Sequence, residues 1–396
     1  MRIGVDATCW PVRRGYGRFT RALLTAALAI DRKNEYVFFV DSDSQEFPLP
    51  EASAGIRRVA SSVPASRAAA ADGRRALWDI WSLSRAISRE SFDLFFFPSV
   101  YSYVPVINAV PKIVTVHDII SDLYPELVFP TRRSKLFWRA KVKLACAQAR
   151  MILTVSEYSR RCLADYMKIP PSRLRSVNEA SDPVFQRLKA ADGRALFARL
   201  GLSLGVRFLT YVGGFSPHKN LRLLVDVFGQ LQSNTNFSDV RLLLVGDYEH
   251  DVFYSCYSEI VEQVQQARLQ QRVIFTGYLS DEDLVVLLNL TQALALPSFC
   301  EGFGLPAVEA AACGAPTVVT TESPLPDLLG EGTIGVAPND RAGLLKALET
   351  IVGDPARQQA MSTAALTAAA RLSWENSARQ LIEVFEEVCE ARGATA

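Results

Sequence analysis

Short runs of consecutive apolar residues alternate along the chain with stretches in which apolar residues recur every three or four positions. In the first half, the apolar runs predict strands at 3–6, 36–40, 56–60, 94–97, 113–117, 152–155 and 174–177. The amphipathic stretches predict helices between them, most clearly at 19–30, 75–88, 132–149 and 156–167. Continuously apolar strands separated by helices are typical of a parallel sheet that helices cover on both faces.

The alternation lapses around residues 179–191, where Asp182 and Pro183 predict a turn, and then resumes. Further strands are predicted at 208–212, 241–245, 273–276, near 293 and at 316–320, with helices at 221–231, 252–269 and 281–288. The chain is predicted to be helical from 340 onward, with a last helix over 373–391. Two such series predict an α/β protein with two Rossmann-like domains and a cleft between them, in which ligands lie beyond the carboxyl ends of the strands.

Charge is unevenly distributed, although the formal net charge of the 396 residues is only +1. Residues 1–185 contain 27 Lys and Arg against 18 Asp and Glu, a net of +9, so the remainder carries −8. A basic first half predicts an anionic partner, either a phosphate-bearing acceptor or an acidic membrane surface. The basic residues are not interleaved with aromatic residues in the way that would indicate nucleic acid.

Seven scattered cysteines form no Cys-x-x-Cys pair and are accompanied by only three histidines, so neither a disulfide framework nor a zinc site is predicted. They are typical of reduced thiols in a cytosolic protein. The first residues read as a strand and not as a signal peptide, and no stretch is apolar and long enough for a spanning helix. We therefore expect a cytoplasmic protein.

The stretch 301–309, E-G-F-G-L-P-A-V-E, follows the apolar strand near 293 and leads into a helix that has Pro306 at its start. Glycines allow the backbone to approach a ligand closely, and a helix N-terminus with free N–H groups favours a diphosphate. Glu301 and Glu309 would repel phosphate, so sugar hydroxyls are their expected partners. The alternative is that Glu309 complements the helix dipole and Glu301 is a solvated loop residue.

A second informative stretch, 211–220, has the sequence Y-V-G-G-F-S-P-H-K-N. It places Lys219 at the start of a helix, an unfavourable position for a cation unless an anion is bound there. A diphosphate contact is the interpretation this favours, with a solvated lysine as the alternative.

In the first half, His117 and Asp118 lie at the carboxyl end of a strand, and a glycine-containing loop, G-Y-G-R at 15–18, follows the first strand. The histidine is expected to contact a sugar or an acceptor, oriented by Asp118, or else to be structural. The basic helix 132–143 is expected either to lie on an anionic membrane or to be a domain helix with a solvated basic side.

The pattern E-G-F-G-L-P-x-x-E followed by A-x-x-C-G-A-P-T-V-V resembles the signature of family-4 retaining glycosyltransferases, which have the GT-B fold. The resemblance implies an acceptor domain at 1–185, a nucleotide-sugar-binding domain at 186–372 and a closing helix at 373–396 that crosses back to the first domain. It implies transfer of a sugar from a nucleoside-diphosphate sugar to an acceptor hydroxyl, with retained anomeric configuration and without a metal or cofactor. The variants present are most similar to members that build bacterial polysaccharide or lipopolysaccharide, often with mannose.

Site residues follow from the same resemblance. The implied catalytic residues are His117, Lys219 and Glu301. The implied donor-binding residues are Gly15, Gly17, Gly213, Gly214, Lys219, Asn220, Tyr278, Gly302, Phe303, Gly304, Leu305 and Glu309. The implied acceptor-binding residues are Arg14, Arg18 and Asp118.

The chain departs from the family pattern at Gly214, where many members have a phosphate-binding arginine. That departure keeps a non-catalytic sugar-nucleotide-binding protein open as an alternative. Sugar-nucleotide epimerases share the two-domain fold and are a second alternative.

Overall fold

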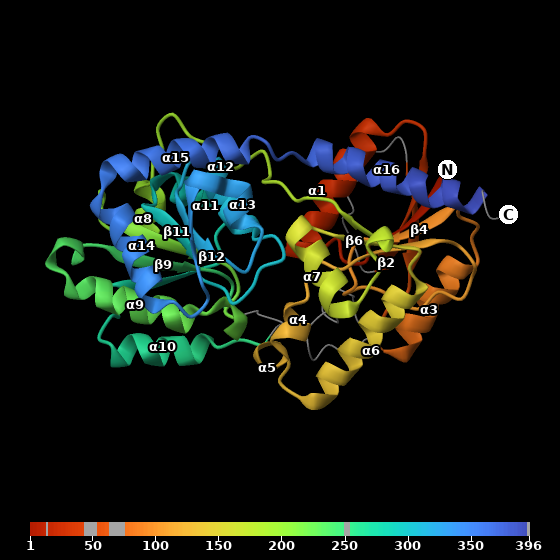
Figure 1. The fold of residues 1–396 in the computed structure, drawn as a ribbon, viewed down its shortest axis with the longest axis horizontal. Helices are drawn as coiled ribbons and strands as arrows, with labels where there is room; N and C mark the ends of the chain where they lie inside the picture. Colours follow the sequence, from red (N-terminus) through yellow and green to blue (C-terminus); the bar gives the residue numbers. More distant parts are fainter. Residues whose placement is uncertain (13–14, 43–53, 63–75, 249–253, 394–396) are drawn as a thin grey trace. The chain divides into compact units, whose positions relative to one another are not determined.

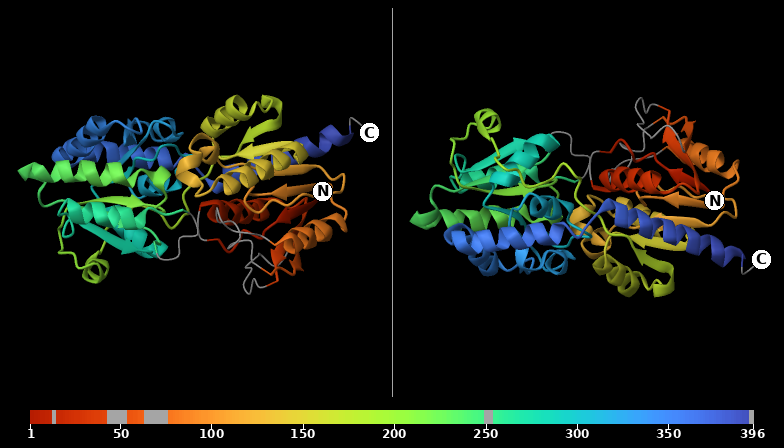
Figure 2. Two further views of the ribbon diagram at one scale, coloured as in Figure 1. Left: turned by 90° about the horizontal axis from the view of Figure 1, so that it is seen from below. Right: turned by 90° about the horizontal axis from the view of Figure 1, so that it is seen from above.

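The computed structural model describes residues 1–12, 15–42, 54–62, 76–248 and 254–393, and it divides the chain into two compact units. Unit 1 comprises Met1–Glu179 together with Ser373–Ala396, and unit 2 comprises Ala180–Leu372 (Figure 1). Unit 1 ends at residue 179, six residues before the boundary expected from the sequence. Because the last segment returns to unit 1, both chain ends lie on this unit (Figure 2).

Unit 1 is built on a seven-stranded parallel sheet in the order β3-β2-β1-β4-β5-β6-β7. The strands are β1 (Arg2–Asp6), β2 (Glu35–Asp41), β3 (Ala54–Val59), β4 (Leu94–Phe97), β5 (Lys112–Thr115), β6 (Met151–Thr154) and β7 (Leu174–Ser176). All seven predicted strands of the first half are therefore confirmed. The sheet order reverses between β1 and β4, and such reversals are where ligands bind in open α/β sheets.

Helices cover both faces of this sheet, as the apolar strands predict. They are α1 (Gly15–Ile30), α3 (Leu77–Ser88), α4 (Ile120–Leu123), α5 (Pro125–Val128), α6 (Arg132–Gln148), α7 (Glu157–Met167) and α16 (Trp374–Gly393). In β4, Phe95 and Phe97 pack into the cluster formed with α3, α6 and α7, whereas Phe96 meets Phe385 of α16 edge-on. Successive residues of a strand point to opposite faces, so this phenylalanine run is buried on both sides.

Two helix starts follow from local sequence. The Ser156 side chain accepts a hydrogen bond from Ser159 N and caps α7, as predicted. Thr131 caps α6 in the same way through Ser134 N. The final helix, α16, packs along α1, which confirms that the last segment crosses back to the first domain.

Unit 2 has a six-stranded parallel sheet in the order β10-β9-β8-β11-β12-β13. The strands are β8 (Phe208–Val212), β9 (Arg241–Val245), β10 (Val273–Gly277), β11 (Ala293–Leu296), β12 (Thr317–Thr320) and β13 (Thr333–Val336). Its helices are α8 (Arg194–Arg199), α9 (Leu221–Ser233), α10 (Tyr257–Gln266), α11 (Asp281–Leu290), α12 (Leu305–Ala312), α13 (Leu325–Leu329), α14 (Arg341–Gly353) and α15 (Pro355–Ala369). Here the order reverses between β8 and β11.

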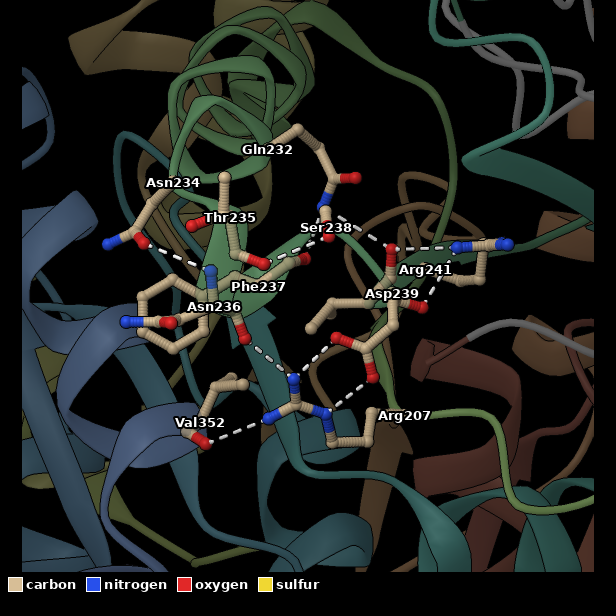
Figure 3. A network of polar contacts seen from close by, with 11 residues as sticks. Arg207, Gln232, Asn234, Thr235, Asn236, Phe237, Ser238, Asp239, Arg241 and Val352 are labelled. Atoms are coloured by element: carbon tan, nitrogen blue, oxygen red, sulfur yellow. Dashed lines mark hydrogen bonds and ion pairs between the residues drawn. The ribbon is translucent and has the colours of Figure 1, made fainter.

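The amino-terminal end of β8 is held by a polar network around Arg207 (Figure 3). Its guanidinium forms an ion pair with Asp239, in which Nε lies 2.7 Å from Oδ2, and Nη2 donates to Asn236 O at 2.8 Å. A longer contact of 3.4 Å reaches Val352 O at the end of α14. These bonds connect the turn before β9 and the end of α14 to the start of β8, at the edge of the sheet opposite the carboxyl ends of the strands.

The structure adds elements that the sequence pattern did not predict. Strand β13 was missed because its four residues include Gly335 and are only partly buried, so no apolar run marks it. The helix predicted at 252–269 is shorter, running from Tyr257 to Gln266, and residues 249–253 lie outside the described ranges. In the described part of the chain, no helix is long and apolar enough to cross a membrane.

Candidate active site

Two loops of unit 2 follow neighbouring strands at the point where the sheet order reverses. One runs from β8 through Gly213 and Gly214 to the start of α9, and the other runs from β11 to the start of α12. Asn220, buried and in the left-handed conformation (φ 58°), joins them by donating its side-chain amide to Pro297 O at 3.1 Å and to Pro338 O at 2.7 Å. The amide that was expected to contact a donor is therefore bonded within the unit.

Lys219 and Glu301 meet at this junction. Lys219 Nζ lies 2.7 Å from Glu301 Oε1, and the side chains are 20% and 8% exposed. The alternatives of a solvated lysine and a solvated glutamate are both wrong. The cation next to the α9 start is compensated by a carboxylate from the neighbouring loop, and the pair lies where the sequence predicts the diphosphate and the sugar.

Residues 302–305 lead directly from Glu301 into α12. Gly304 precedes the helix with φ 88°, and a Cβ there would lie 2.6 Å from Leu325 Cδ1. Only glycine meets both the backbone and the packing requirement. Phe303 and Leu305 are 3% and 7% exposed, so their side chains belong to the core and only their backbone is available to a ligand. Gly302 is also buried.

Glu309 lies one turn into α12 and is only 2% exposed. A carboxylate held inside the protein is more constrained than a surface residue that complements a helix dipole. Its position one turn into the helix that begins after Glu301 keeps it a candidate for binding hydroxyl groups. The contact with the donor that the sequence predicts for it stays a prediction.

The glycines after β8 are required partly by the chain itself. Gly213 has φ 155°, and its carbonyl lies where a Cβ on Gly246 would be, at 2.0 Å. Gly214 O accepts a hydrogen bond of 2.6 Å from Tyr211 Oη. A Cβ on Gly213 would lie 2.6 Å from Tyr211 Oη, so packing within the unit explains the glycines at 213 and 246 without a ligand. The backbone of Gly213 and Gly214 lies at the predicted diphosphate position.

Tyr278 follows β10, and its side chain is 56% exposed. The ring is therefore not part of the core and is accessible for stacking. The sequence did not predict a nearby aromatic cluster, in which the rings of Tyr248 and Tyr257 stack on each other at 4.2 Å and Phe215 meets both rings edge-on. Single aromatic residues far apart in sequence have no local signal that would predict such a cluster.

In unit 1, His117 lies just beyond β5, beside the end of β4. Its ring is hydrogen-bonded to the backbone of Pro98, which has no N–H, so the imidazole donates. Nε2 has no partner among the described residues, and the side chain is buried, with 9% of its surface exposed. Burial lowers the pKa of His117 to about 4, so the ring is neutral at pH 7 and Nε2 is a hydrogen-bond acceptor.

Two neighbours define the orientation of this ring. Phe19 of α1 meets it edge-on at 4.9 Å, and Glu179 Oε1 lies 3.9 Å from Nδ1. Because the imidazole is neutral, the glutamate contact is not an ion pair at pH 7. The sequence assigned the orienting role to Asp118, but Asp118 Oδ1 accepts a hydrogen bond from Ile120 N and shapes the turn into α4. Pro98 supplies the orienting hydrogen bond.

The loop after β1 is only partly described. Arg14 lies outside the described residues, and Arg18 is half-buried on α1. A Cβ on Gly17 would lie 2.0 Å from Val12 O, so the chain itself occupies the space that was assigned to the donor. Gly15 is exposed, and no described residue lies near its Cβ position, so this position is open to a ligand.

Ser298 is the residue of this site that the sequence reading missed. It is fully buried, and its Oγ donates a hydrogen bond of 2.5 Å to Glu301 Oε1. A serine three residues before a glutamate is a weak signal unless the loop geometry is known. Among the described residues, no group of three or more His, Cys, Asp or Glu side chains is arranged to hold a metal ion.

Sequence models of two protein families match the chain. The model described as Glycosyltransferase Family 4 matches residues 14–183, and the model described as Glycosyl transferases group 1 matches residues 193–368. The two matches together span most of the chain and correspond to the two sheets.

Curated relatives are similar at low identity. The serotype-specific mannosyltransferase WbdA of Escherichia coli is 26% identical over 298 residues, which are 74% of this chain but only 35% of that protein. The chain thus spans about a third of the length of that relative. The O-antigen chain mannosyltransferase B of Escherichia coli is 27% identical over 276 residues, which are 69% of this chain and 70% of that protein.

Solved structures share the whole fold. Sucrose-phosphate synthase from Thermosynechococcus elongatus superposes with a TM-score of 0.76 at 20% identity, covering 99% of this chain and 100% of that one. WaaG, a glycosyltransferase involved in lipopolysaccharide biosynthesis, superposes with a TM-score of 0.70 at 12% identity, covering 97% and 99%. At these identities the likeness shows the GT-B fold alone.

Proposed function

Since this chain belongs to family 4 of the glycosyltransferases, we propose that it transfers a sugar from a nucleoside-diphosphate sugar to an acceptor hydroxyl and retains the anomeric configuration. The observation that carries the proposal is the Lys219–Glu301 pair at the point where the sheet order of unit 2 reverses. A cation, a carboxylate and a helix start are close together there, and these groups suit a diphosphate and a sugar.

The chemical difficulty of this reaction is the negative charge that develops on the leaving diphosphate. In our proposal Lys219 and the start of α12 stabilise that charge, while Glu301 accepts hydrogen bonds from the donor sugar and Glu309 from the ribose. The acceptor hydroxyl attacks on the same face that the leaving group departs from, and its proton passes to the leaving phosphate. Neither a metal ion nor a cofactor takes part.

We propose that His117 contacts a hydroxyl group of the donor sugar or of the acceptor. A neutral imidazole whose Nδ1–H is bonded to Pro98 O offers Nε2 to a hydroxyl group, and burial makes an unpaired acceptor there costly without a ligand. A buried acceptor without a described partner is a feature of ligand sites as well as of strained cores. We therefore propose that a substrate hydroxyl completes its hydrogen bonding.

The proposed sugar is mannose or a similar hexose, and the proposed product is a bacterial polysaccharide, lipopolysaccharide or glycolipid. Support comes from the relatives named as a serotype-specific mannosyltransferase and an O-antigen chain mannosyltransferase. A structure titled as a complex with UDP and glucose, that of HepE from Anabaena, shares the fold with a TM-score of 0.72, at 18% identity and with 98% and 100% of the chains covered. Nucleoside diphosphates are therefore the ligands to test first.

We also propose peripheral contact with an anionic membrane, at the cytoplasmic face of the plasma membrane, where a lipid-linked acceptor would be met. The support is α6, which has six lysines and arginines and no acidic residue. Leu136 and Phe137 on this helix are 71% and 63% exposed. A basic helix that also exposes large apolar side chains matches the headgroup region of a bilayer.

The test is binding to a panel of nucleoside diphosphates and nucleotide sugars, followed by thermal unfolding. We expect one base to be preferred and the stabilisation to be reduced in Lys219→Ala and Glu309→Ala. Arg194→Ala is the matched control, because Arg194 is an exposed cation of unit 2 paired with Asp192. Stabilisation by no member of the panel would refute the proposal.

Turnover separates the remaining possibilities. A glycosyltransferase releases nucleoside diphosphate in proportion to acceptor, whereas an epimerase converts the nucleotide sugar without acceptor and a binding protein does neither. We expect Lys219→Ala to lower the turnover number by about a hundredfold, the usual effect of removing one group that stabilises transition-state charge.

A further inference from the structure

Ser298 carries a buried hydroxyl next to the proposed sugar-binding carboxylate. It lies two residues beyond β11, is fully buried, and donates to Glu301 Oε1 at 2.5 Å. Lys219 Nζ binds the same oxygen at 2.7 Å. No residue in the described ranges donates a hydrogen bond to Glu301 Oε2, so the two carboxylate oxygens are in different environments.

The backbone around Ser298 is held on both sides. Pro297 O accepts the Asn220 amide at 3.1 Å, and Phe299 N donates to His218 O at 2.9 Å. The loop that carries Ser298 is thus bonded to the loop that carries Lys219, and the serine hydroxyl has little freedom to move away from the carboxylate.

Two donors on one oxygen have a geometric consequence. A glutamate side chain has three rotatable bonds, and fixing Oε1 at two points selects one arrangement of the carboxylate. The other oxygen is then presented in one direction. A carboxylate oxygen has lone pairs for about two donors, which matches one or two hydroxyl groups of a sugar.

We propose that Ser298 is a positioning residue that, together with Lys219, holds Glu301 Oε1 so that Oε2 receives the hydroxyl groups of the donor sugar. The inference rests on the proposed function, because it concerns how this site recognises the sugar part of a nucleoside-diphosphate sugar. Ser298 contacts Glu301, which the proposed function assigns to the sugar, so its removal should weaken the binding of the sugar more than that of the diphosphate.

The consequence is a selective loss of affinity. The difference in affinity between a nucleotide sugar and its own nucleoside diphosphate measures what the sugar contributes. In Ser298→Ala we expect this advantage to fall by about tenfold, the usual scale for a lost hydrogen bond to a charged group, while the affinity for the nucleoside diphosphate stays within about twofold of wild type.

The experiment measures the dissociation constants of GDP-mannose and GDP, and of UDP-glucose and UDP, by calorimetry on the full chain. Ser362→Ala is the matched control, because Ser362 is a buried serine of unit 2 whose hydroxyl donates a hydrogen bond to Gly314 O, away from the site. We expect it to lose stability as Ser298→Ala does but to keep the wild-type affinities. Ser298→Thr, which keeps the hydroxyl, should retain most of the sugar's contribution to binding.

Several outcomes would overturn the inference. Equal losses for the nucleotide sugar and its nucleoside diphosphate in Ser298→Ala would mean a general structural role, and unchanged affinities would mean no role. If Ser298→Ala does not fold, Ser298→Cys replaces it, since a thiol fills the same space but is a weak donor, and the same selective loss is expected. If the wild-type chain binds no member of the panel of nucleoside diphosphates and nucleotide sugars, the proposed function fails first and this inference with it.

Discussion

Replacing His117 by glutamine should remove one identifiable part of the acid sensitivity of unit 1. The pKa of the buried imidazole is lowered from its ordinary 6.5 to about 4. Between these two pH values the unfolded chain binds a proton at this residue and the folded chain does not. Acid therefore favours unfolding, and the stability that is present above pH 6.5 is lost progressively as the pH falls toward 4.

The expected size follows from the shift. The full lowering of the pKa corresponds to about 3 kcal/mol. For a single group, about 1 kcal/mol of this is lost at pH 5.5 and between about 2 and 3 kcal/mol at pH 4.5. Glutamine does not titrate, so the free energy of unfolding of the variant should fall between pH 7 and each of these pH values by that much less than it falls in wild type. This holds even if the variant is less stable than wild type at pH 7.

Urea unfolding followed by tryptophan fluorescence is suited to the measurement. All five tryptophans lie in the residues that form unit 1, so the signal reports this unit alone. NMR of labelled imidazole provides a second reading, because the chain has only three histidines and the variant assigns the His117 signal. Parallel pH curves for wild type and variant, or a His117 signal that titrates near 6.5, would refute the burial argument.

Two further predictions concern packing and surface. Gly17→Ala should destabilise unit 1 by about 2 to 3 kcal/mol, because its Cβ would lie 2.0 Å from Val12 O. Gly15→Ala, at a position with no described residue near its Cβ, should change the stability by less than about 1 kcal/mol. The urea concentration at the unfolding midpoint, followed by tryptophan fluorescence, measures both changes. Phe137→Ser should weaken co-sedimentation with vesicles that contain phosphatidylglycerol by about tenfold. Leu204→Ser is the control, because Leu204 is an equally exposed apolar residue of unit 2, and this variant should bind the vesicles as wild type does. Equal binding by both variants would contradict membrane contact through α6.

Much of the fold was predictable because it depends on periodicity along the chain. Four consecutive apolar residues predict a strand such as β4. The capping serine Ser156 predicts the start of α7, the helix that follows β6. Strand β13 was not predictable, because a short and partly exposed strand has no apolar run and depends on its neighbour, β12, for its hydrogen bonds.

Site residues were predictable by type more than by partner. Glycine at position 17 signals a close approach, but the sequence does not say whether a ligand or the chain itself comes close, and here it is the Val12 carbonyl. In the same way, a histidine followed by an aspartate suggested a pair, yet the ring of His117 is oriented by Pro98, from a different strand end.

By itself, the sequence determined that the chain forms two α/β domains, each with a parallel sheet. It also determined where the motifs with glycine, lysine and glutamate lie along the chain, because these properties are local. Only the tertiary structure decided that Lys219 and Glu301, 82 residues apart, form an ion pair and that Ser298 completes it. The physical reason is that β8 and β11 are neighbours in the sheet although two other strands, β9 and β10, separate them in the chain. Which side chains meet at that edge depends on the sheet order, and the order follows from the packing of the whole unit.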